Sequence, residues 1–178
     1  MAADSRDAAE RARRVRLMLF DVDGVLTDGR LWYGPAGEEM KAFSVLDGQG
    51  MRLLAESGVT LGVLSGRRSP AAAARCADLR LEHVMLGIED KLAAWEGLRA
   101  KLGLPPENCG YMGDDLIDAR VMRRCGFACA PREALEQVRS LAHYVCGAPA
   151  GAGAAREACE FVMRAQGTWD TAVSRFID

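Results

Sequence analysis

Short, nearly continuous apolar runs alternate along this sequence with longer segments of helical periodicity. The first run, residues 15–20 (VRLMLF), stops at an acidic turn that contains glycine. A strand buried on both faces of a sheet has this pattern. Similar runs follow at residues 59–64, 81–86 and 109–112, with weaker ones at 127–130 and 143–146. The alternation predicts an α/β fold, with a mostly parallel sheet and helices on both of its faces.

Helix signals fill the segments between these runs. Ser69 is a good N-cap residue and Pro70 suits the first helical position, so a helix is predicted to begin there. Residues 89–102 carry an apolar stripe at helical spacing, which core packing explains: Leu92, Trp95, Leu98 and Leu102. Further helices are predicted near Gly48 and at residues 115–125, 133–142 and 154–166.

Three segments depart from this rhythm. Residues 30–45 contain a Gly-Pro-Ala-Gly turn between two stretches that can pair as an antiparallel β-hairpin. Residues 1–14 are expected to be a flexible amino-terminal segment, and residues 167–178 an irregular carboxyl-terminal tail. A length of 178 residues suits one domain. That domain is predicted to span residues 15–178, with the hairpin as a small insertion.

Composition narrows the possible partners and the compartment. The formal net charge is -2 and the pI is near 5.8, so no basic surface for nucleic acid or an anionic membrane is expected. No apolar run approaches the roughly 20 residues of a membrane span, and the amino terminus lacks the apolar segment of a secretory signal. These features favour a cytoplasmic protein. The six cysteines are therefore expected to be buried free thiols.

Two aspartates follow the first predicted strand. Asp21 and Asp23 stand at alternate positions, at the end of a strand where open parallel sheets place their ligands. Two carboxylates crowded into one crevice favour a neutralising cation, and hard oxygen ligands suit Mg²⁺. The plainer alternative is that both are surface turn residues.

Polar residues follow three further predicted strands. The predicted strand that ends at Met112 is followed by a second acidic cluster, made of Asp114, Asp115 and Asp118. Ser65, Gly66 and Arg67 follow another strand, and Lys91 lies near the start of a helix. Hydroxyl, backbone amide and ammonium donors at one sheet edge form a set that binds anions. Taken singly, each would be read as a loop or solvated surface residue.

The order of these motifs resembles the haloacid dehalogenase superfamily of phosphohydrolases, with its Rossmann-like fold. The matching segments are DVDGV, LSGR, the pair Asp90-Lys91, and GDDLID. The resemblance implies that Asp21 attacks phosphorus to form an aspartyl-phosphate, and that Asp23 is the general acid and base. It also implies Mg²⁺ bound by Asp21, the backbone carbonyl of Asp23 and Asp114, with Asp115 or Asp118 acting directly or through water. Ser65 and Lys91 would hold the phosphoryl oxygens, helped by the amides of Gly24 and Val25.

The resemblance extends almost end to end to one family, the 3-deoxy-D-manno-octulosonate 8-phosphate phosphatases. It includes DVDGVLTDG, LDGQG, SGRRS, GIEDK, YMGDD and GAAREACEFVMRAQG. The spans from Asp23 to Gly48 and from Lys91 to Asp114 are too short for the cap domain that many superfamily members insert. The family resemblance therefore implies a capless homotetramer, with hairpins between subunits and a neighbour's tail or loop over each site.

Substrate recognition is the least constrained part of the prediction. The sugar carboxylate calls for a cation, and Arg67, Arg68 and a neighbour's Lys41 are the candidates. Leu46 and Ala152 stand where many relatives carry arginine or another polar residue, which removes possible substrate contacts. Two alternatives follow: a phosphatase for a related nonulosonate 9-phosphate, or a noncatalytic module that tetramerises a sugar-nucleotide synthetase.

Overall fold

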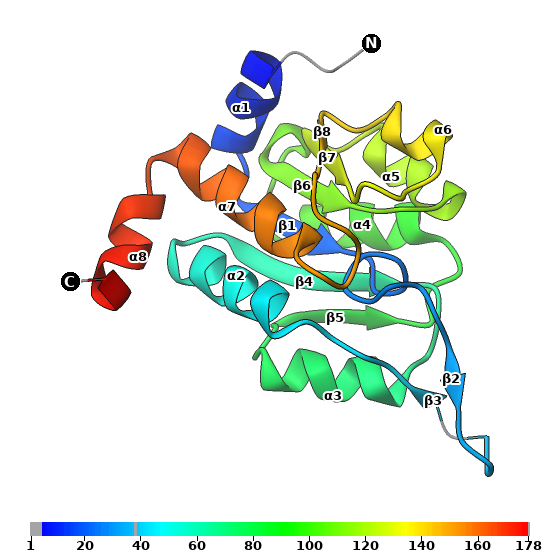
Figure 1. Cartoon of the computed structure of the whole chain (residues 1–178). Helices are drawn as coiled ribbons and strands as arrows, with labels where there is room; N and C mark the ends of the chain where they lie inside the picture. Colours follow the sequence, from blue (N-terminus) through cyan, green and yellow to red (C-terminus); the bar gives the residue numbers. More distant parts are fainter. Residues whose placement is uncertain (1–4, 38, 178) are drawn as a thin grey trace.

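The computed structural model describes residues 5–37 and 39–177 of the chain. At its centre lies a six-stranded sheet in the order β5-β4-β1-β6-β7-β8, with every neighbouring pair parallel (Figure 1). The strands are β1 (Leu17–Phe20), β4 (Thr60–Ser65), β5 (His83–Leu86), β6 (Cys109–Met112), β7 (Phe127–Ala130) and β8 (Tyr144–Val145). The predicted α/β fold with a mostly parallel sheet is confirmed.

The central strands are buried on both faces because alternate side chains enter two separate cores. In β1, Met18 and Phe20 belong to one hydrophobic cluster, whereas Leu17 and Leu19 belong to the other. All four side chains are fully buried. Because alternate side chains of a strand point to opposite faces and both faces are buried here, every residue of β1 is apolar; the charged Arg16 lies just before the strand and is exposed.

Each core is closed by its own set of helices (Figure 1). One face is covered by α2 (Val45–Glu56), α3 (Pro70–Asp78), α7 (Ala154–Gln166) and α1 (Ser5–Arg13). The opposite face is covered by α4 (Lys91–Lys101), α5 (Ala119–Met122) and α6 (Glu136–Arg139). The stripe predicted in α4 packs as expected, since Leu92, Trp95 and Leu98 are buried and Leu102 packs against the same cluster.

Two helices begin at capping side chains, and the first of these caps, Ser69, was predicted from the sequence. The side chain of Ser69 accepts a hydrogen bond from the amide of Ala72, and Pro70 is the first residue of α3. Asp90 caps α4 in the same way, through the amide of Ala93 at 3.1 Å. A side-chain acceptor at the N-cap satisfies an amide that has no partner within the helix.

Two helices are shorter than predicted because the residues expected in their first turns adopt other conformations near the site. The helix expected at residues 115–125 begins as a 3-10 turn, η2 (Leu116–Asp118), and only then continues as α5. The helix expected at residues 133–142 reduces to α6, and its N-cap residue Leu135 donates its amide to the carbonyl of Asp114. A second 3-10 turn, η1 (Pro106–Asn108), precedes β6.

The predicted hairpin is present and projects from the carboxyl edge of the sheet (Figure 1). Its strands β2 (Trp32–Tyr33) and β3 (Glu39–Met40) are antiparallel, with Trp32 opposite Met40 and Tyr33 opposite Glu39. No cap domain lies over the site among the described residues, as the short connecting spans predicted.

The prediction of a flexible segment over residues 1–14 is wrong for the residues of α1. Ala8 and Ala12 are buried, and α1 lies along α7. Gln166 of α7 donates hydrogen bonds to the carbonyls of Ala12 and Val15, at 3.4 and 2.8 Å. Small alanines allow the two helices to approach closely. Residues 1–4 lie outside the described part of the chain.

The expectation of an irregular tail after Gln166 is also wrong. Gly167 ends α7 in a left-handed conformation, and a new helix, α8 (Trp169–Ile177), follows. The ring of Trp169 lies beneath the guanidinium groups of Arg156 and Arg164, and Arg175 pairs with Glu56 of α2. These contacts with two other helices hold the segment as a helix.

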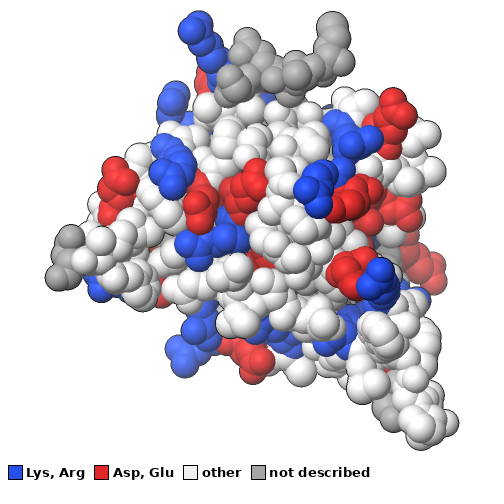
Figure 2. All heavy atoms as spheres, in the orientation of Figure 1, with Lys and Arg blue, Asp and Glu red and all other residues white. Residues whose placement is uncertain are grey.

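Three composition-based expectations can be compared with the structure. All six cysteines are buried and free, as predicted. Basic and acidic side chains are interspersed over the face shown in Figure 2, without a large patch of one sign. Among the described residues, no helix has both the length and the apolar character needed to span a bilayer.

Candidate active site

The site lies where β1 and β6 end side by side at the carboxyl edge of the sheet. Asp21 follows β1 directly, and its amide donates to the carbonyl of Met112 at the end of β6, at 2.9 Å. One residue, Gly113, separates Asp114 from the end of β6. Because these neighbouring strands lead to helices on opposite faces, a crevice opens between the strand ends. The carboxylates predicted at these two strand ends are therefore brought together.

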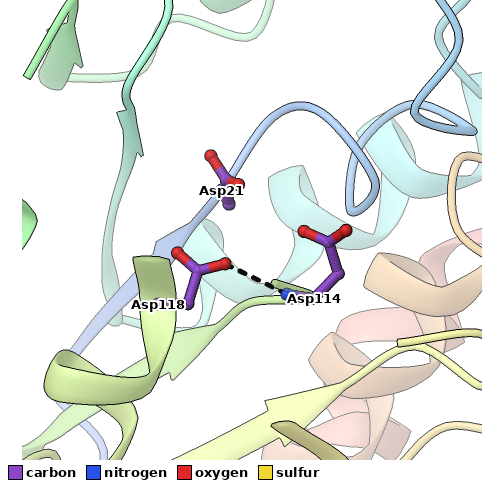
Figure 3. Close-up of side chains that lie close together, drawn as sticks. All are labelled: Asp21, Asp114 and Asp118. Atoms are coloured by element: carbon purple, nitrogen blue, oxygen red, sulfur yellow. Dashed lines mark hydrogen bonds between the residues drawn. The ribbon is translucent and has the colours of Figure 1, made fainter. Parts of the chain in front are cut away.

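Three carboxylates converge in this crevice (Figure 3). Asp21, Asp114 and Asp118 each offer an oxygen, and these oxygens all lie within 4.8 Å of one another. Burial, followed by the charge of Asp118, raises the pKa of Asp21 to about 7. Burial, followed by the charges of Asp21 and Asp118, raises the pKa of Asp114 to about 7. Such crowding is relieved by a bound cation, so the cluster is suited to a metal.

Asp114 has the free ligand atom that such a metal needs. Its Oδ1 is buried and has no hydrogen-bond partner within residues 5–37 and 39–177. A buried acceptor without a partner is costly, and carboxylate oxygens are the donors that Mg²⁺ prefers. The residues present therefore fit a magnesium ion.

Asp118 differs from the other two carboxylates because both of its oxygens already have partners. Its Oδ2 accepts the amides of Asp114 and Asp115, at 3.1 and 3.3 Å. Its Oδ1 accepts the Tyr111 hydroxyl at 2.6 Å and lies 2.7 Å from Lys91 Nζ. Asp118 is fully buried, and these contacts fix the loop that carries Asp114.

Lys91 joins the two acidic segments. Its Nζ lies 2.9 Å from Asp21 Oδ1 and 2.7 Å from Asp118 Oδ1, and the side chain is almost completely buried. Burial by itself would lower the pKa of Lys91, but the charges of Asp21 and Asp118 outweigh it and raise the pKa above its ordinary value. Lys91 is therefore a permanent cation beside Asp21.

Gly24 makes room for the acidic cluster. Its φ is +83°, and a Cβ atom there would lie 2.0 Å from Asp114 Oδ2. Only glycine accommodates both the left-handed backbone and this close approach. The neighbouring amide of Val25 donates to the Val22 carbonyl at 3.3 Å, within the turn that follows β1.

Asp23 lies beside two cations. Lys41 Nζ pairs with Asp23 Oδ1, and Arg67 Nε lies 3.6 Å from Asp23 Oδ2. Lys41, proposed from the sequence as a residue donated by a neighbour, thus contacts Asp23 within its own chain. Arg67 also donates to Glu39 and to the Tyr33 hydroxyl, at 3.2 and 3.0 Å.

The loop after β4 supplies the remaining donors. Ser65 is buried, and its hydroxyl accepts the amide of Arg67 at 3.3 Å. Its carbonyl accepts the amide of Ile88, which ties this loop to the segment before α4. Gly66 and Arg68 are exposed beside it. Ser65 and Lys91 are therefore held at the same edge as Asp21.

Asp115 lies apart from the acidic cluster. It is exposed, and its Oδ1 accepts the amide of Leu116 at 2.6 Å, so it caps the 3-10 turn η2. Four contacting residues were missed by sequence reasoning as site residues: Tyr33, Glu39, Ser69 and Tyr111. Glu39 and Lys41 are two apart in an extended segment, a spacing that places both on one face and could have suggested a shared role.

Comparisons with known proteins agree with this geometry. No protein-family model matches the chain. The Escherichia coli 3-deoxy-D-manno-octulosonate 8-phosphate phosphatase KdsC is 40% identical over 173 residues, covering 97% of this chain and 92% of that protein. The chain belongs to the 3-deoxy-D-manno-octulosonate 8-phosphate phosphatase family. The family predicted from the motifs is thereby confirmed.

Solved structures of similar proteins have the same fold. A probable YrbI family phosphatase from Pseudomonas syringae is 44% identical, with a TM-score of 0.95 and coverage of 97% of this chain and 98% of that one. The family's phosphatase from Moraxella catarrhalis, in complex with a magnesium ion, a phosphate ion and a KDO molecule, is 37% identical. Its TM-score is 0.94, and the match covers 96% of this chain and 98% of that one.

Proposed function

We propose that this enzyme hydrolyses 3-deoxy-D-manno-octulosonate 8-phosphate to the sugar acid and phosphate, with Asp21 as the nucleophile. The observation that carries the proposal is the position of Asp21, which belongs to the acidic cluster at the carboxyl edge and lies beside buried Lys91. The curated relative named above acts on this sugar phosphate, and the Moraxella catarrhalis structure holds the sugar, phosphate and magnesium.

Magnesium is proposed to bind to Asp21, to the backbone carbonyl of Asp23 and to the partnerless Oδ1 of Asp114. Asp118 is proposed to position the loop, because its oxygens are occupied by Lys91, Tyr111 and backbone amides. When bound, the ion offsets the negative charge that the carboxylates and the phosphoryl group bring together.

In the first step, a carboxylate oxygen of Asp21 attacks phosphorus. The bond from phosphorus to the sugar oxygen breaks, and Asp23 gives its proton to that oxygen as the sugar leaves. The products are an aspartyl-phosphate on Asp21 and a carboxylate on Asp23. Lys91 lies 2.9 Å from Asp21 Oδ1 and offsets charge on the attacking side.

In the second step, water attacks the phosphorus of the aspartyl-phosphate. Asp23, now a carboxylate, takes a proton from the water, and the bond between phosphorus and the Asp21 oxygen breaks. Phosphate leaves, Asp21 returns as a carboxylate and Asp23 returns protonated. Ser65 and the Gly24 amide are proposed to hold the phosphoryl oxygens through both steps, together with Lys91.

The open site leads us to propose a homotetramer in which a neighbouring subunit covers the substrate. Trp32 and Met40 of the hairpin are 58% and 54% exposed, and Phe176 and Ile177 at the end of α8 are also exposed. Apolar side chains gathered on projecting elements favour contact with another protein surface. Arg67 and Arg68 are the proposed contacts of the sugar carboxylate.

A cytoplasmic location is part of this proposal. Six buried free thiols suit a reducing compartment, where disulfides are rare. The similarity to 3-deoxy-D-manno-octulosonate 8-phosphate phosphatases favours the octulosonate phosphate over a nonulosonate 9-phosphate as the substrate. It also favours an enzyme over a noncatalytic assembly module.

The decisive experiment measures phosphate release from 3-deoxy-D-manno-octulosonate 8-phosphate and from a nonulosonate 9-phosphate, with Mg²⁺ and with a chelator. We expect Mg²⁺-dependent turnover and a preference for the octulosonate. A preference for the nonulosonate would retain the mechanism and reassign the substrate. No release from either substrate by a folded, Mg²⁺-loaded protein would refute the proposed function.

A further inference from the structure

The β2-β3 hairpin has two faces with different chemistry. Trp32 and Met40 are paired across the hairpin and are largely exposed. Tyr33 and Glu39 form the next pair, and both contact Arg67. Because neighbouring residues of a strand point to opposite faces, the hairpin presents apolar groups on one side and polar groups toward the site on the other.

Lys41 continues the polar face directly into the site. Its side chain is fully buried, which is rare for lysine unless the ammonium is paired. The Nζ atom pairs with Asp23 Oδ1 and lies 3.7 Å from Glu39 Oε1. The contact with Asp23 thus fixes one oxygen of the carboxyl group.

The other oxygen of Asp23, Oδ2, is buried and makes no hydrogen bond to the described residues. Its one cationic neighbour among them, Arg67 Nε, lies 3.6 Å away. A carboxyl group that transfers a proton needs one free oxygen aimed at the reacting atom, and an anchor on the other oxygen sets that aim.

The hairpin also secures the groups around Lys41. Glu39 accepts the Ser69 hydroxyl through Oε1 and Arg67 through Oε2. Ser69 in turn caps α3 through the amide of Ala72. Glu39 therefore attaches the hairpin to the start of α3, and this attachment fixes the position of Lys41.

We propose that Lys41 is a positioning residue for the general acid Asp23, and that the hairpin sets the aim of proton transfer by holding Lys41. This inference rests on the proposed function and gives Lys41 a role within its own subunit. It also links the surface proposed for assembly to the chemical step, since the exposed and buried faces belong to the same short hairpin.

The test uses aryl phosphates that differ in the basicity of the leaving group and carry no carboxylate. A basic leaving group needs a proton from Asp23, whereas a nitrophenolate leaves readily without one. Because general acids contribute about 10²–10⁴-fold, we expect Lys41→Met to lower kcat/KM for phenyl phosphate by about 100-fold and for 4-nitrophenyl phosphate by less than about tenfold. The dependence of kcat/KM on leaving-group basicity should therefore steepen.

Two variants and one measurement complete the design. Lys101→Met, at the exposed end of α4, removes a lysine elsewhere and should leave the slope unchanged. Lys41→Arg keeps the cation and should recover part of the slope. Thermal unfolding with Mg²⁺ checks that each variant is folded.

The possible outcomes separate the roles of Lys41. An equal loss for every aryl phosphate would indicate a structural role and overturn the inference. Unchanged kinetics on aryl phosphates, with a loss only for the sugar acid, would make Lys41 a substrate contact and also overturn it. Wild-type turnover that needs Mg²⁺ and is abolished by Asp21→Asn keeps the proposed function intact in either case.

Discussion

At the scale of single residues, Lys91 occupies a position that is electrostatically unfavourable for a cation. It is the first residue of α4, so its ammonium stands at the positive end of the helix dipole, where anions are favoured. It is also buried, which costs an unpaired cation several kcal/mol. The carboxylates of Asp21 and Asp118, at 2.9 and 2.7 Å, offset both costs. A residue kept where local physics disfavours it is a good candidate for a chemical role.

The first prediction concerns the nucleophile. Asp21→Asn should lower kcat by at least about four orders of magnitude, as removal of a nucleophile does in other enzymes. The fold should persist, because the change removes one charge from a crowded acidic cluster. Phosphate release and the melting temperature measure the two effects. Turnover near the wild-type level would contradict the assignment of Asp21.

The second prediction concerns the space beside Asp114. Gly24→Ala should abolish activity and weaken Mg²⁺ binding, because the new Cβ would lie 2.0 Å from Asp114 Oδ2. Gly37→Ala is the matched control. Gly37 has the same φ of +83°, but a Cβ there meets no atom of the described residues within 4 Å. The backbone strain of about 1 kcal/mol is then common to both variants, and only Gly24→Ala has the clash. Equal activities would contradict the explanation.

At the scale of elements, α7 depends on a cap from another helix. Its N-cap residue is Gly153, which has no side chain to offer. Asp47 of α2 accepts the amides of Gly153 and Arg156 instead, at 3.3 and 2.8 Å, and is almost fully buried. Gly151, just before α7, donates its amide to the Val25 carbonyl in the turn after β1. The cap thus also supports the turn that carries Gly24.

The third prediction follows from this cap. Asp47→Ala should lower the free energy of unfolding by about 2 kcal/mol, because it leaves two partly buried amides without an acceptor. The two amides bond to different oxygens of Asp47, so Asp47→Asn keeps an acceptor for one of them and presents an NH2 group to the other. It should therefore lose less stability than the alanine variant. Urea unfolding measures both, with Asp170→Ala at the exposed start of α8 as the control. Equal losses for the alanine and asparagine variants would rule out the capping role.

The fourth prediction concerns pH and the edge of the sheet. The Nδ1 atom of His143 accepts the amide of Ala128 at 2.8 Å, which requires a neutral ring. Burial, with help from the charge of Arg11, lowers the pKa of His143 below its ordinary value of 6.5. The unfolded chain therefore binds a proton more readily than the folded one. This contribution to stability is fully present above about pH 6.5 and is lost as the pH falls below that value toward the lower pKa of the folded state.

A variant isolates this effect from the titration of the carboxylates. In His143→Asn, an amide oxygen can accept the same hydrogen bond but does not titrate. Between about pH 7.5 and 5.5, the wild type should lose more unfolding free energy than the variant. Urea unfolding at the two pH values measures the difference. Equal losses would show that His143 does not contribute to the pH dependence.

At the scale of the whole molecule, the order of the strands assembles the site. Asp21 and Asp114 are far apart in sequence, but β1 and β6 are neighbours, so the two carboxylates share one crevice. Ser65 joins them because β4 lies on the other side of β1. The cluster concentrates negative charge that the folded chain tolerates better with a cation bound.

The fifth prediction tests this coupling between the metal and the fold. Mg²⁺ should raise the stability of the wild type, by about 2.7 kcal/mol at a hundredfold excess over Kd. Asp114→Asn should remove most of this gain, whereas Asp115→Asn should retain it because Asp115 is exposed and caps η2. Thermal unfolding over a range of Mg²⁺ concentrations makes the comparison. Equal loss in both variants would place Asp115 among the ligands.

The sequence by itself determined the architecture and the main chemical groups. Nearly continuous apolar runs such as 15–20 identify strands buried on both faces, because a strand with one exposed face would alternate apolar and polar residues. Ser69 with Pro70 fixes the start of α3, and the clustered polar residues after the strands indicate the edge where the acidic cluster and Lys91 meet. These features are local, since they depend on residues close together along the chain.

Only the tertiary structure decided which residues are paired and which segments fold against others. α1 is rich in alanine, glutamate and arginine and has two i,i+4 ion pairs, a local helix signal that the sequence interpretation did not use; the structure adds that α1 packs against α7. α8 is held beside α7 and is paired with α2 through Arg175. Asp118 contacts Lys91 and Tyr111 from other elements and two backbone amides of its own loop. Lys41 pairs with Asp23 from a different segment. These contacts depend on tertiary packing or on the conformation of a loop. A sequence shows which charged groups are present. The energies of their interactions depend on distances of a few ångströms, and only the packed chain defines those distances.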